Sequence, residues 1–267
     1  MIHLVEDPGD PRIEDYRAVR ERDLVGRNGR FIAEGVVVLE KLIAAGRHPI
    51  RSVLVAQKRL APLRALIEAL PETVPVYAAT QSVMDEIVGF PMHRGVLAAG
   101  ERAEPAAHDL LARLPDRALV VGLCGIANHD NIGGLFRNAA AFGADAVLLD
   151  TGCCDPLYRK AIRVSVGAAL TLPFARLRPE HDVLHTLAAA GFEVIALSPG
   201  GTATLDQLGA APRQAVLLGA EGSGLPAELL ARARTVRIPM AGDFDSLNVA
   251  TASGIVLHHL AAVRSRA

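Results

Sequence analysis

Apolar and polar positions in the first hundred residues alternate between two patterns, one typical of helices and one typical of buried strands. VVVLEKLIAAG at 36–46 places apolar residues at helical spacing and ends at a glycine, and RSVLVA at 51–56 is a short apolar run that predicts a strand. The same order repeats twice, with further strands predicted in VPVYAA (74–79) and RGVLAAG (94–100). This pattern predicts an αβαβαβ unit of ordinary small-domain size.

The alternation continues from residue 118 towards the end of the chain. Strands are predicted at 118–123, 146–150, 192–197, 215–219 and 236–240, with helical stretches between them. Because parallel neighbours need a crossover connection, this order predicts an α/β fold whose sheet is mostly parallel, with helices on both faces. Ligands of such sheets bind at the carboxyl ends of the strands, which makes the loops after residues 123, 219 and 240 the candidate site.

A charged stretch with two prolines, ERAEPAAHDLLARLPDR at 101–117, separates these two regions and predicts a linker. Residues 13–26 carry many charges and few apolar positions, so a surface helix or arm is expected there. We therefore expect an N-terminal arm and a smaller α/β domain over residues 1–104, a linker over 105–117 and a larger α/β domain over 118–267.

Composition narrows the class of protein. With 51% hydrophobic but only 4% aromatic residues, the interior must consist mostly of Ala, Val, Leu and Ile, which suits helices packed on strands. The 28 Lys and Arg residues nearly balance 29 Asp and Glu residues, so net charge neither supports nor excludes RNA. Three cysteines without CxxC spacing suggest neither a zinc site nor a disulfide framework. The absence of a secretory signal and of a bilayer-length apolar stretch predicts a cytoplasmic protein with no membrane partner.

The loop after residue 123 reads CGIANHDNIGGLFRNAAAFGAD and runs into a predicted helix. Ile132, Leu135, Phe136 and Ala139 follow the spacing of a buried helical stripe, so the helix should begin near Asn131, which is then a natural N-cap. Arg137 interrupts a run of small and apolar residues in this helix. It is either a solvated arginine or a contact for phosphate or an acidic partner.

The other two loops are rich in glycine and short polar residues. LLGAEGSGLP around residue 219 allows close backbone approach to a ligand, and Glu221 in its middle is either an exposed turn residue or the partner of an arginine. No P-loop pattern occurs in the chain, which disfavours a nucleotide triphosphate enzyme. In IPMAGDFDSLNVA, Ser246 is expected to cap the last helix and Asn248 to lie in its first turn.

Taken together and in this order, the three loops resemble the signature motifs of a known family. NIGxxxRNAAAFGAD, LGAEGSGLP and IPMxGxxxSLNVA resemble those of the SpoU-type, or TrmH-like, RNA ribose 2′-O-methyltransferases of the SPOUT superfamily, over about residues 118–262. The stretches GRFIAEGVVVLEKLI, IRSVLVAQ and MHRGVLA resemble, more weakly, the L30e-like substrate-binding domain found ahead of many such enzymes.

The resemblance implies a deep trefoil knot in the C-terminal domain, a homodimer, S-adenosylmethionine as cofactor, an RNA partner and no metal. The active-site residues that match the motifs are Asn131, Arg137, Glu221, Ser246 and Asn248. The cofactor-binding residues that it implies are Leu217, Gly219, Gly222, Ile238, Met240 and Leu247. RNA contacts are expected from basic residues and a turn histidine, namely Arg30, His93, Arg94, Arg159, Lys160 and Arg163. The acidic Asp243 and Asp245 depart from what a phosphate-binding loop would favour.

In this family the arginine that matches Arg137 has been proposed as the general base. A guanidinium effectively never loses its proton in a protein, so we expect Arg137 to bind the adjacent phosphate and stabilise the developing alkoxide. Ser246 and Asn248 would orient the hydroxyl. The extra N-terminal domain favours ribosomal RNA over tRNA as the substrate. A non-catalytic RNA-binding or ribosome assembly protein of the same fold is the alternative outside enzymes, and a dinucleotide oxidoreductase is disfavoured because no glycine fingerprint follows the first strand of the second region.

Overall fold

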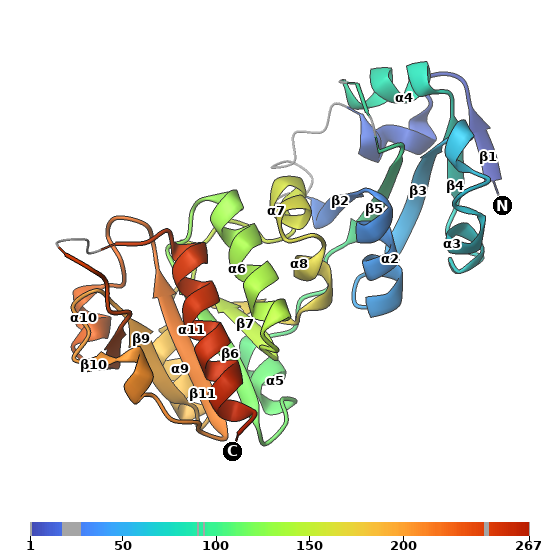
Figure 1. The fold of residues 1–267 in the computed structure, drawn as a ribbon. Coiled ribbons are helices and arrows are strands. Elements are labelled where there is room, and N and C mark those ends of the chain that lie inside the picture. Colours follow the sequence, from blue (N-terminus) through green and yellow to red (C-terminus); the bar gives the residue numbers. More distant parts are fainter. Residues whose placement is uncertain (1, 18–27, 90, 93, 243–245, 267) are drawn as a thin grey trace. The chain divides into compact units, whose positions relative to one another are not determined.

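The chain folds into two compact units (Figure 1). The computed structural model describes residues 2–17, 28–89, 91–92, 94–242 and 246–266. The first unit consists of Met1–Ala103 together with Leu157–Thr171, and the second consists of Glu104–Pro156 together with Leu172–Ala267.

The first unit is built on a five-stranded sheet in the order β1-β4-β3-β5-β2. Its strands are β1 (Ile2–Val5), β2 (Arg30–Glu34), β3 (Ile50–Ala56), β4 (Val76–Ala79) and β5 (Val96–Glu101). The helices are η1 (Pro11–Tyr16), α2 (Val36–Ala45), η2 (Gln57–Arg59), α3 (Arg64–Glu68) and α4 (Gln81–Val88). β1, β4 and β3 are parallel, whereas β5 is antiparallel to both β3 and β2. The sheet is therefore mixed.

Two strands of this unit, β1 and β2, were not expected from the sequence. β1 lies at an edge of the sheet and has only one buried residue, Val5, so it lacks a strong apolar run. The arm expected at 13–26 includes part of η1, in which Ile13 and Tyr16 are buried. Tyr16 packs into the unit because its hydroxyl bonds the Ser52 Oγ at 2.7 Å and accepts from the Ala99 N–H at 3.2 Å. Residues 18–27 lie outside the described part of the chain.

The first unit also includes two helices from the middle of the sequence, α7 (Arg159–Val164) and α8 (Ala168–Thr171). Lys41 of α2 donates from Nζ to the Val166 carbonyl at 2.7 Å, and Arg159 donates from Nε to the Glu34 carboxylate at 3.0 Å. This segment was predicted to belong to the domain 118–267, because contacts between residues 125 positions apart leave no local pattern in the sequence.

The second unit contains a seven-stranded sheet in the order β10-β12-β9-β11-β6-β7-β8. Its strands are β6 (Ala118–Cys124), β7 (Ala146–Leu149), β8 (Phe174–Arg176), β9 (Glu193–Leu197), β10 (Ala203–Thr204), β11 (Arg213–Gly219) and β12 (Arg234–Arg237). The helices are α5 (Ala107–Ala112), α6 (His129–Ala141), α9 (Val183–Ala189), η3 (Leu205–Gln207), α10 (Ala227–Leu230) and α11 (Val249–Arg264). Every neighbouring pair is parallel, which confirms the predicted α/β class. The trefoil knot stays a prediction.

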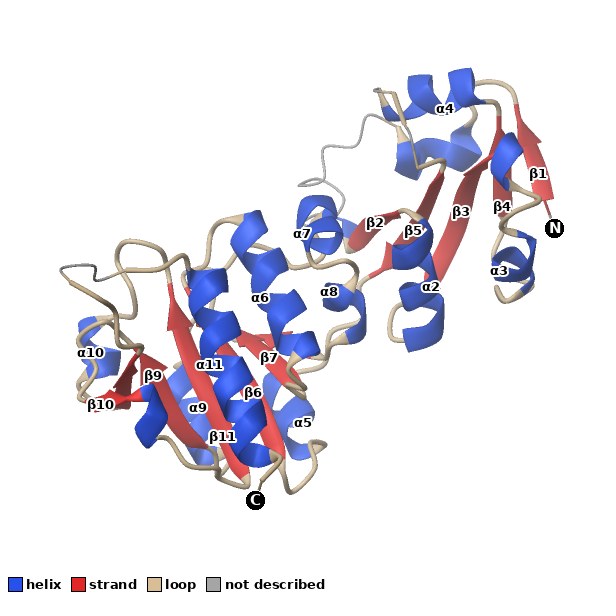
Figure 2. Ribbon diagram, viewed as in Figure 1, coloured by secondary structure: helices blue, strands red, loops and turns tan. Residues whose placement is uncertain are grey.

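Helices cover both faces of this sheet. α6 and α11 lie side by side on one face, and α5 and α9 lie on the other (Figure 2). On the α5 and α9 side, Leu110, Leu111 and Leu187 form a buried cluster with alternate residues of β6 and β11. Residues 105–117, expected to be a linker, thus contain a helix whose two leucines belong to the core of the second unit. Along the described residues, no helix combines the length and the apolar character needed to cross a membrane.

Candidate active site

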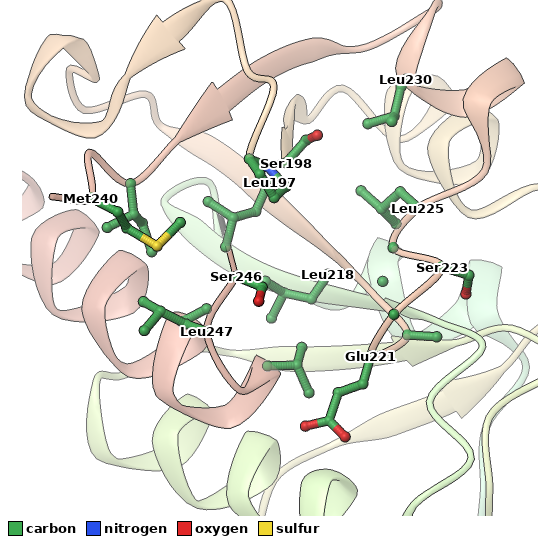
Figure 3. A pocket seen from close by; sticks show the side chains of 18 residues that line it. Leu197, Ser198, Leu218, Glu221, Ser223, Leu225, Leu230, Met240, Ser246 and Leu247 are labelled. Atoms are coloured by element: carbon green, nitrogen blue, oxygen red, sulfur yellow. The ribbon is translucent and has the colours of Figure 1, made fainter. Parts of the chain in front are cut away.

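Three loops meet at the carboxyl edge of the parallel sheet in the second unit, as its topology requires. They follow β9, β11 and β12, and together with the residues just before α11 they line a cavity of about 430 Å³ (Figure 3). Cavities of this size are typical of small-molecule and cofactor sites. The edge of the sheet that the sequence indicated therefore carries a cavity.

Most of the residues predicted to bind a cofactor line this cavity. They are Gly219, Gly222, Ile238, Met240 and Leu247, and the cavity also includes Glu221 and Ser246 from the predicted active-site set. Leu217 does not line it, because its side chain is fully buried in the cluster formed with α5 and α9. Strand alternation explains this difference, since neighbouring strand residues face opposite sides of the sheet and Leu218 is the one that reaches the cavity.

Sequence reasoning missed the wall that follows β9, formed by Leu197, Ser198 and Pro199. The strand itself was predicted, and the rule that ligands bind at the carboxyl ends of strands applies equally to the loop after it. That loop carries none of the three motifs, so it was not among the loops predicted to form the site. Further lining residues that were not predicted are Leu218, Ala220, Ser223, Gly224, Leu225, Leu230, Val249 and Ala252.

The wall after β11 is a tight turn made of backbone. Gly224 donates its N–H to the Ala220 carbonyl at 2.9 Å, and Gly222 and Gly224 have φ angles of 84° and 67°, which favour glycine. A Cβ added to Gly219 would lie 2.3 Å from the carbonyl carbon of Gly224 and from the nitrogen of Leu225. The cavity thus has a wall that a larger residue at 219 would disrupt.

A polar cluster stands beside the cavity and is joined by Asn248. Its Nδ2 donates to Asn131 Oδ1 at 3.0 Å and to the Glu221 carboxylate, and its Oδ1 accepts from the N–H groups of Ala250 and Thr251 at 2.9 and 3.3 Å. Asn131 is 7% exposed, whereas Glu221 and Asn248 are exposed. One side chain therefore links residues of α6, the glycine turn and the start of α11.

Both predicted helix caps are wrong. α6 begins at His129 and is capped by Asn128, whose Oδ1 accepts from the Asp130 N–H at 2.8 Å, so Asn131 lies inside the first turn. α11 begins at Val249 and is capped by Asn248 instead of Ser246. In each case two polar residues lie within three positions of each other and either can cap a helix. The apolar stripe of the helix does not determine which of the two is the cap.

Arg137 and Ser246 are exposed and stand apart from this cluster. Arg137 lies on α6, and in the described part of the chain it makes neither a hydrogen bond nor an ion pair. Ser246 lines the cavity with Leu247 (Figure 3). Asp243 and Asp245 lie outside the described residues. A guanidinium without an internal partner is available to an external anion.

The predicted RNA contacts belong to the first unit. Arg30 pairs with Asp15 at 2.7 Å, while Arg94 and Arg159 flank the Glu34 carboxylate at 3.9 and 3.0 Å. Lys160 and Arg163 are exposed on α7. His93 lies outside the described residues.

The three cysteines are free and poorly suited to chemistry. Burial raises the pKa of Cys124 to about 12 and that of Cys154 to about 11, with nearby aspartates adding to the effect, and it raises the pKa of Cys153 further. These thiols are protonated near neutral pH, so they do not act as nucleophiles. Among the described residues, no group of three or more His, Cys, Asp or Glu side chains is arranged to hold a metal ion.

A parallel α/β sheet with a cavity at its strand ends, and with motif residues around that cavity, defines the class of α/β proteins that bind a ligand at the carboxyl edge of the sheet. The SpoU rRNA Methylase family matches residues 118–258. An uncharacterized tRNA/rRNA methyltransferase of Mycobacterium bovis is 41% identical over 96% of this chain and 91% of its own. The AdoMet-bound rRNA methyltransferase of Sinorhizobium meliloti superimposes with a TM-score of 0.83 at 25% identity over 97% of both chains. An RNA 2′-O ribose methyltransferase structure gives a TM-score of 0.77 at 26% identity, covering 98% of this chain and 100% of its own.

The chain therefore belongs to the SpoU family of RNA methyltransferases, as the three motifs predicted.

Proposed function

We propose that the protein transfers a methyl group to a ribose 2′-hydroxyl in ribosomal RNA. The observation that carries the proposal is the linked set of Asn131, Asn248 and Glu221 beside a cavity at the carboxyl edge of the sheet. Support for the ribose comes from an RNA 2′-O ribose methyltransferase at 26% identity, and support for ribosomal RNA from the Sinorhizobium meliloti rRNA methyltransferase at 25% identity.

The cofactor is S-adenosylmethionine, and the cavity fits it. Its volume of about 430 Å³, the glycine wall at Gly219 and the aliphatic walls at Leu197 and Ile238 suit a flat adenosyl group held by backbone. Ser198 and Ser223 also line the cavity, and a serine hydroxyl can bond the polar groups of such a ligand (Figure 3). When bound, the cofactor supplies an electrophilic methyl group on a positively charged sulfur.

The residues of this chain contribute mainly by positioning the hydroxyl. Holding reacting groups in line contributes a large part of the rate in such transfers. Ser246 and the linked amides of Asn131 and Asn248 orient the ribose, and the exposed Arg137 binds the adjacent phosphate and stabilises negative charge that develops on the oxygen. Arg137 does not serve as the base, because a guanidinium keeps its proton.

The first unit serves as an L30e-like RNA-binding domain in this proposal. Arg163 is the strongest candidate for a phosphate contact, because it is exposed on α7. Arg30, Arg94 and Arg159 are already paired with carboxylates and contribute less, although the side chain of Arg94 is 49% exposed. Changing Arg163 to Glu is expected to weaken RNA binding. The affinity of this variant should also fall less steeply with salt concentration than that of the wild type, since fewer counterions are released on binding.

The active form is a homodimer in this proposal. Ile255 on α11 is 38% exposed although it is a large apolar side chain, and Leu247, which lines the cavity just before α11, is 40% exposed. A second copy packed against α11 would cover Ile255. Light scattering after size-exclusion chromatography tests this, and Ile255→Glu is expected to shift the protein to monomer.

The proposed reaction is tested by incubating the protein with radiolabelled S-adenosylmethionine and RNA from cells that lack the gene. Nuclease digestion and chromatography then identify the labelled nucleoside. A labelled 2′-O-methylnucleoside from ribosomal RNA is the expected product. Label on a base contradicts the ribose assignment, and label only in the tRNA fraction replaces ribosomal RNA with tRNA.

A further inference from the structure

A second asparagine of α6, Asn138, holds the start of α11 from inside the protein. Its Nδ2 donates to the Ala250 carbonyl at 2.6 Å and to the Ser253 Oγ at 2.9 Å, and the Ser253 hydroxyl itself donates to the Ala250 carbonyl at 2.7 Å. Ser253 is fully buried. These bonds form a closed polar triangle between two helices that pack side by side (Figure 2).

Asn138 shares a face of α6 with the active-site residue Asn131. The two asparagines are seven residues apart, which is two helical turns or about 10 Å, and Gly134 lies between them at the i+3 position. A Cβ on Gly134 would lie 2.7 Å from the Ala250 Cβ, so the glycine lets α11 approach closely there. α6 therefore holds α11 at three successive points: Asn131 with Asn248, Gly134 with Ala250, and Asn138 with Ala250 and Ser253.

These contacts fix the position of Asn248. Asn248 caps α11 and its Oδ1 accepts from the N–H of Ala250, the same residue whose carbonyl Asn138 binds. A shift of the first turn of α11 along α6 would therefore move Asn248 away from Asn131 and Glu221. Losses of alignment of about 1 Å are enough to reduce rates about a hundredfold in enzymes that depend on orientation.

We propose that Asn138 is a positioning residue for methyl transfer, acting through Asn248. This inference rests on the proposed function, because it assigns Asn248 to the reacting site. It extends that function to a side chain that does not line the cavity. The backbone wall around Gly219 does not depend on Asn138, and only Val249 and Ala252 of α11 line the cavity from the turn that it holds, so binding of S-adenosylmethionine should weaken much less than the methylation rate falls.

The test is a double-mutant cycle of Asn138→Ala and Asn248→Ala, with single-turnover methylation of ribosomal RNA from a strain lacking the gene as the readout. Asn138→Ala is expected to lower the rate by about tenfold or more in the wild-type background and by less than about twofold when Asn248 is already Ala. The dissociation constant of S-adenosylmethionine, measured by calorimetry, should change by less than about threefold in Asn138→Ala. Hydrogen exchange should become faster in the first turn of α11 and stay unchanged in β11.

Two further variants separate positioning from loss of stability. Leu110→Ala removes a buried side chain on the opposite face of the sheet, so it lowers the melting temperature while the single-turnover rate at a temperature well below melting is unchanged. Ser253→Ala keeps the bond from Asn138 to the Ala250 carbonyl and removes the other, so it should give a smaller rate loss than Asn138→Ala. It replaces Asn138→Ala in the cycle if that variant folds poorly.

Equal rate losses from Asn138→Ala with and without Asn248, or an unchanged rate in folded Asn138→Ala, would overturn the inference. If the wild-type protein labels no ribose, the proposed function is wrong. The hydrogen-exchange result then still decides whether Asn138 holds the first turn of α11.

Discussion

Asn248 Nδ2 donates to Asn131 Oδ1 over 3.0 Å, although the two asparagines lie 117 positions apart in the chain. The same amide donates to Glu221, so a single side chain connects all three sequence motifs. Its oxygen caps α11 at the same time. The same residue thus caps the helix and links the three motif segments.

Asn248→Ala is expected to affect stability and activity by different amounts. Loss of the cap destabilises the protein by about 1 kcal/mol. Loss of the bridge to Asn131 and Glu221 should lower the single-turnover rate by roughly 10²-fold, as for other preorganised polar groups. Asn248→Ser is the matched control: it restores a capping oxygen and stability but does not restore the bridge or the rate. A Ser variant with wild-type activity would show that only the cap matters.

Gly219→Ala should abolish binding of S-adenosylmethionine. The added Cβ would lie 2.3 Å from backbone atoms of Gly224 and Leu225, and backbone does not move aside as a flexible side chain does. The glycine turn must then shift, and the cavity wall with it. Gly209→Ala is the control, since a Cβ there meets nothing within 4 Å and the backbone is not left-handed. Calorimetry on both variants checks the prediction, which fails if Gly219→Ala binds like Gly209→Ala.

Arg137→Ala should leave the fold intact and remove activity. In the described chain the guanidinium has no partner, so the melting temperature should change by less than about 1 °C, as for surface substitutions away from packing contacts. Methylation should fall by roughly 10²-fold or more because charge on the ribose oxygen is no longer stabilised. Arg113→Ala, at an exposed arginine of the same unit, serves as the control. A substantial unchanged rate in Arg137→Ala would remove this residue from the mechanism.

The first unit should lose stability in mild acid because of His48. Burial, helped by the charge of Arg47, lowers the pKa of His48 from 6.5 to about 4 in the folded protein. The unfolded chain therefore binds the proton more readily, and stability present above pH 6.5 is lost as the pH falls towards 4, by up to about 3 kcal/mol. His48→Asn places an amide oxygen near the position of Nδ1, so it keeps an acceptor for the Ala103 N–H but does not titrate. Between pH 7.5 and 5, the free energy of unfolding measured with denaturant should change less for this variant than for the wild type. Equal changes in the two proteins would contradict the role assigned to His48.

Periodicity identified the elements with continuous apolar runs and missed those held by distant contacts. β6, β7, β9 and β11 were predicted because they are buried on both faces, as strands of a parallel sheet are. β8 and β10 have three and two residues, which is too short for a pattern. α7 packs into the first unit through Arg159 and Glu34, a pair that no local rule connects.

The motif residues were predicted as a set, but their arrangement was not. Glu221, Ser246 and Asn248 come from loops whose meeting follows from the parallel sheet. The helix caps were misplaced by two or three residues, because Asn128 and Asn248 compete with Asn131 and Ser246 for the same role. Asn138 was overlooked because its partners, Ala250 and Ser253, look like ordinary helix residues in the sequence.

Mapping ribose methylation in total RNA tests whether the protein methylates a ribose of ribosomal RNA. We compare a strain that lacks the gene with the same strain carrying the wild-type gene or the Asn248→Ala allele. We expect one or a few 2′-O-methylated positions in ribosomal RNA that are absent without the gene, return with the wild type and stay absent or weak with Asn248→Ala. Identical ribose-methylation maps in all three strains would contradict this expectation.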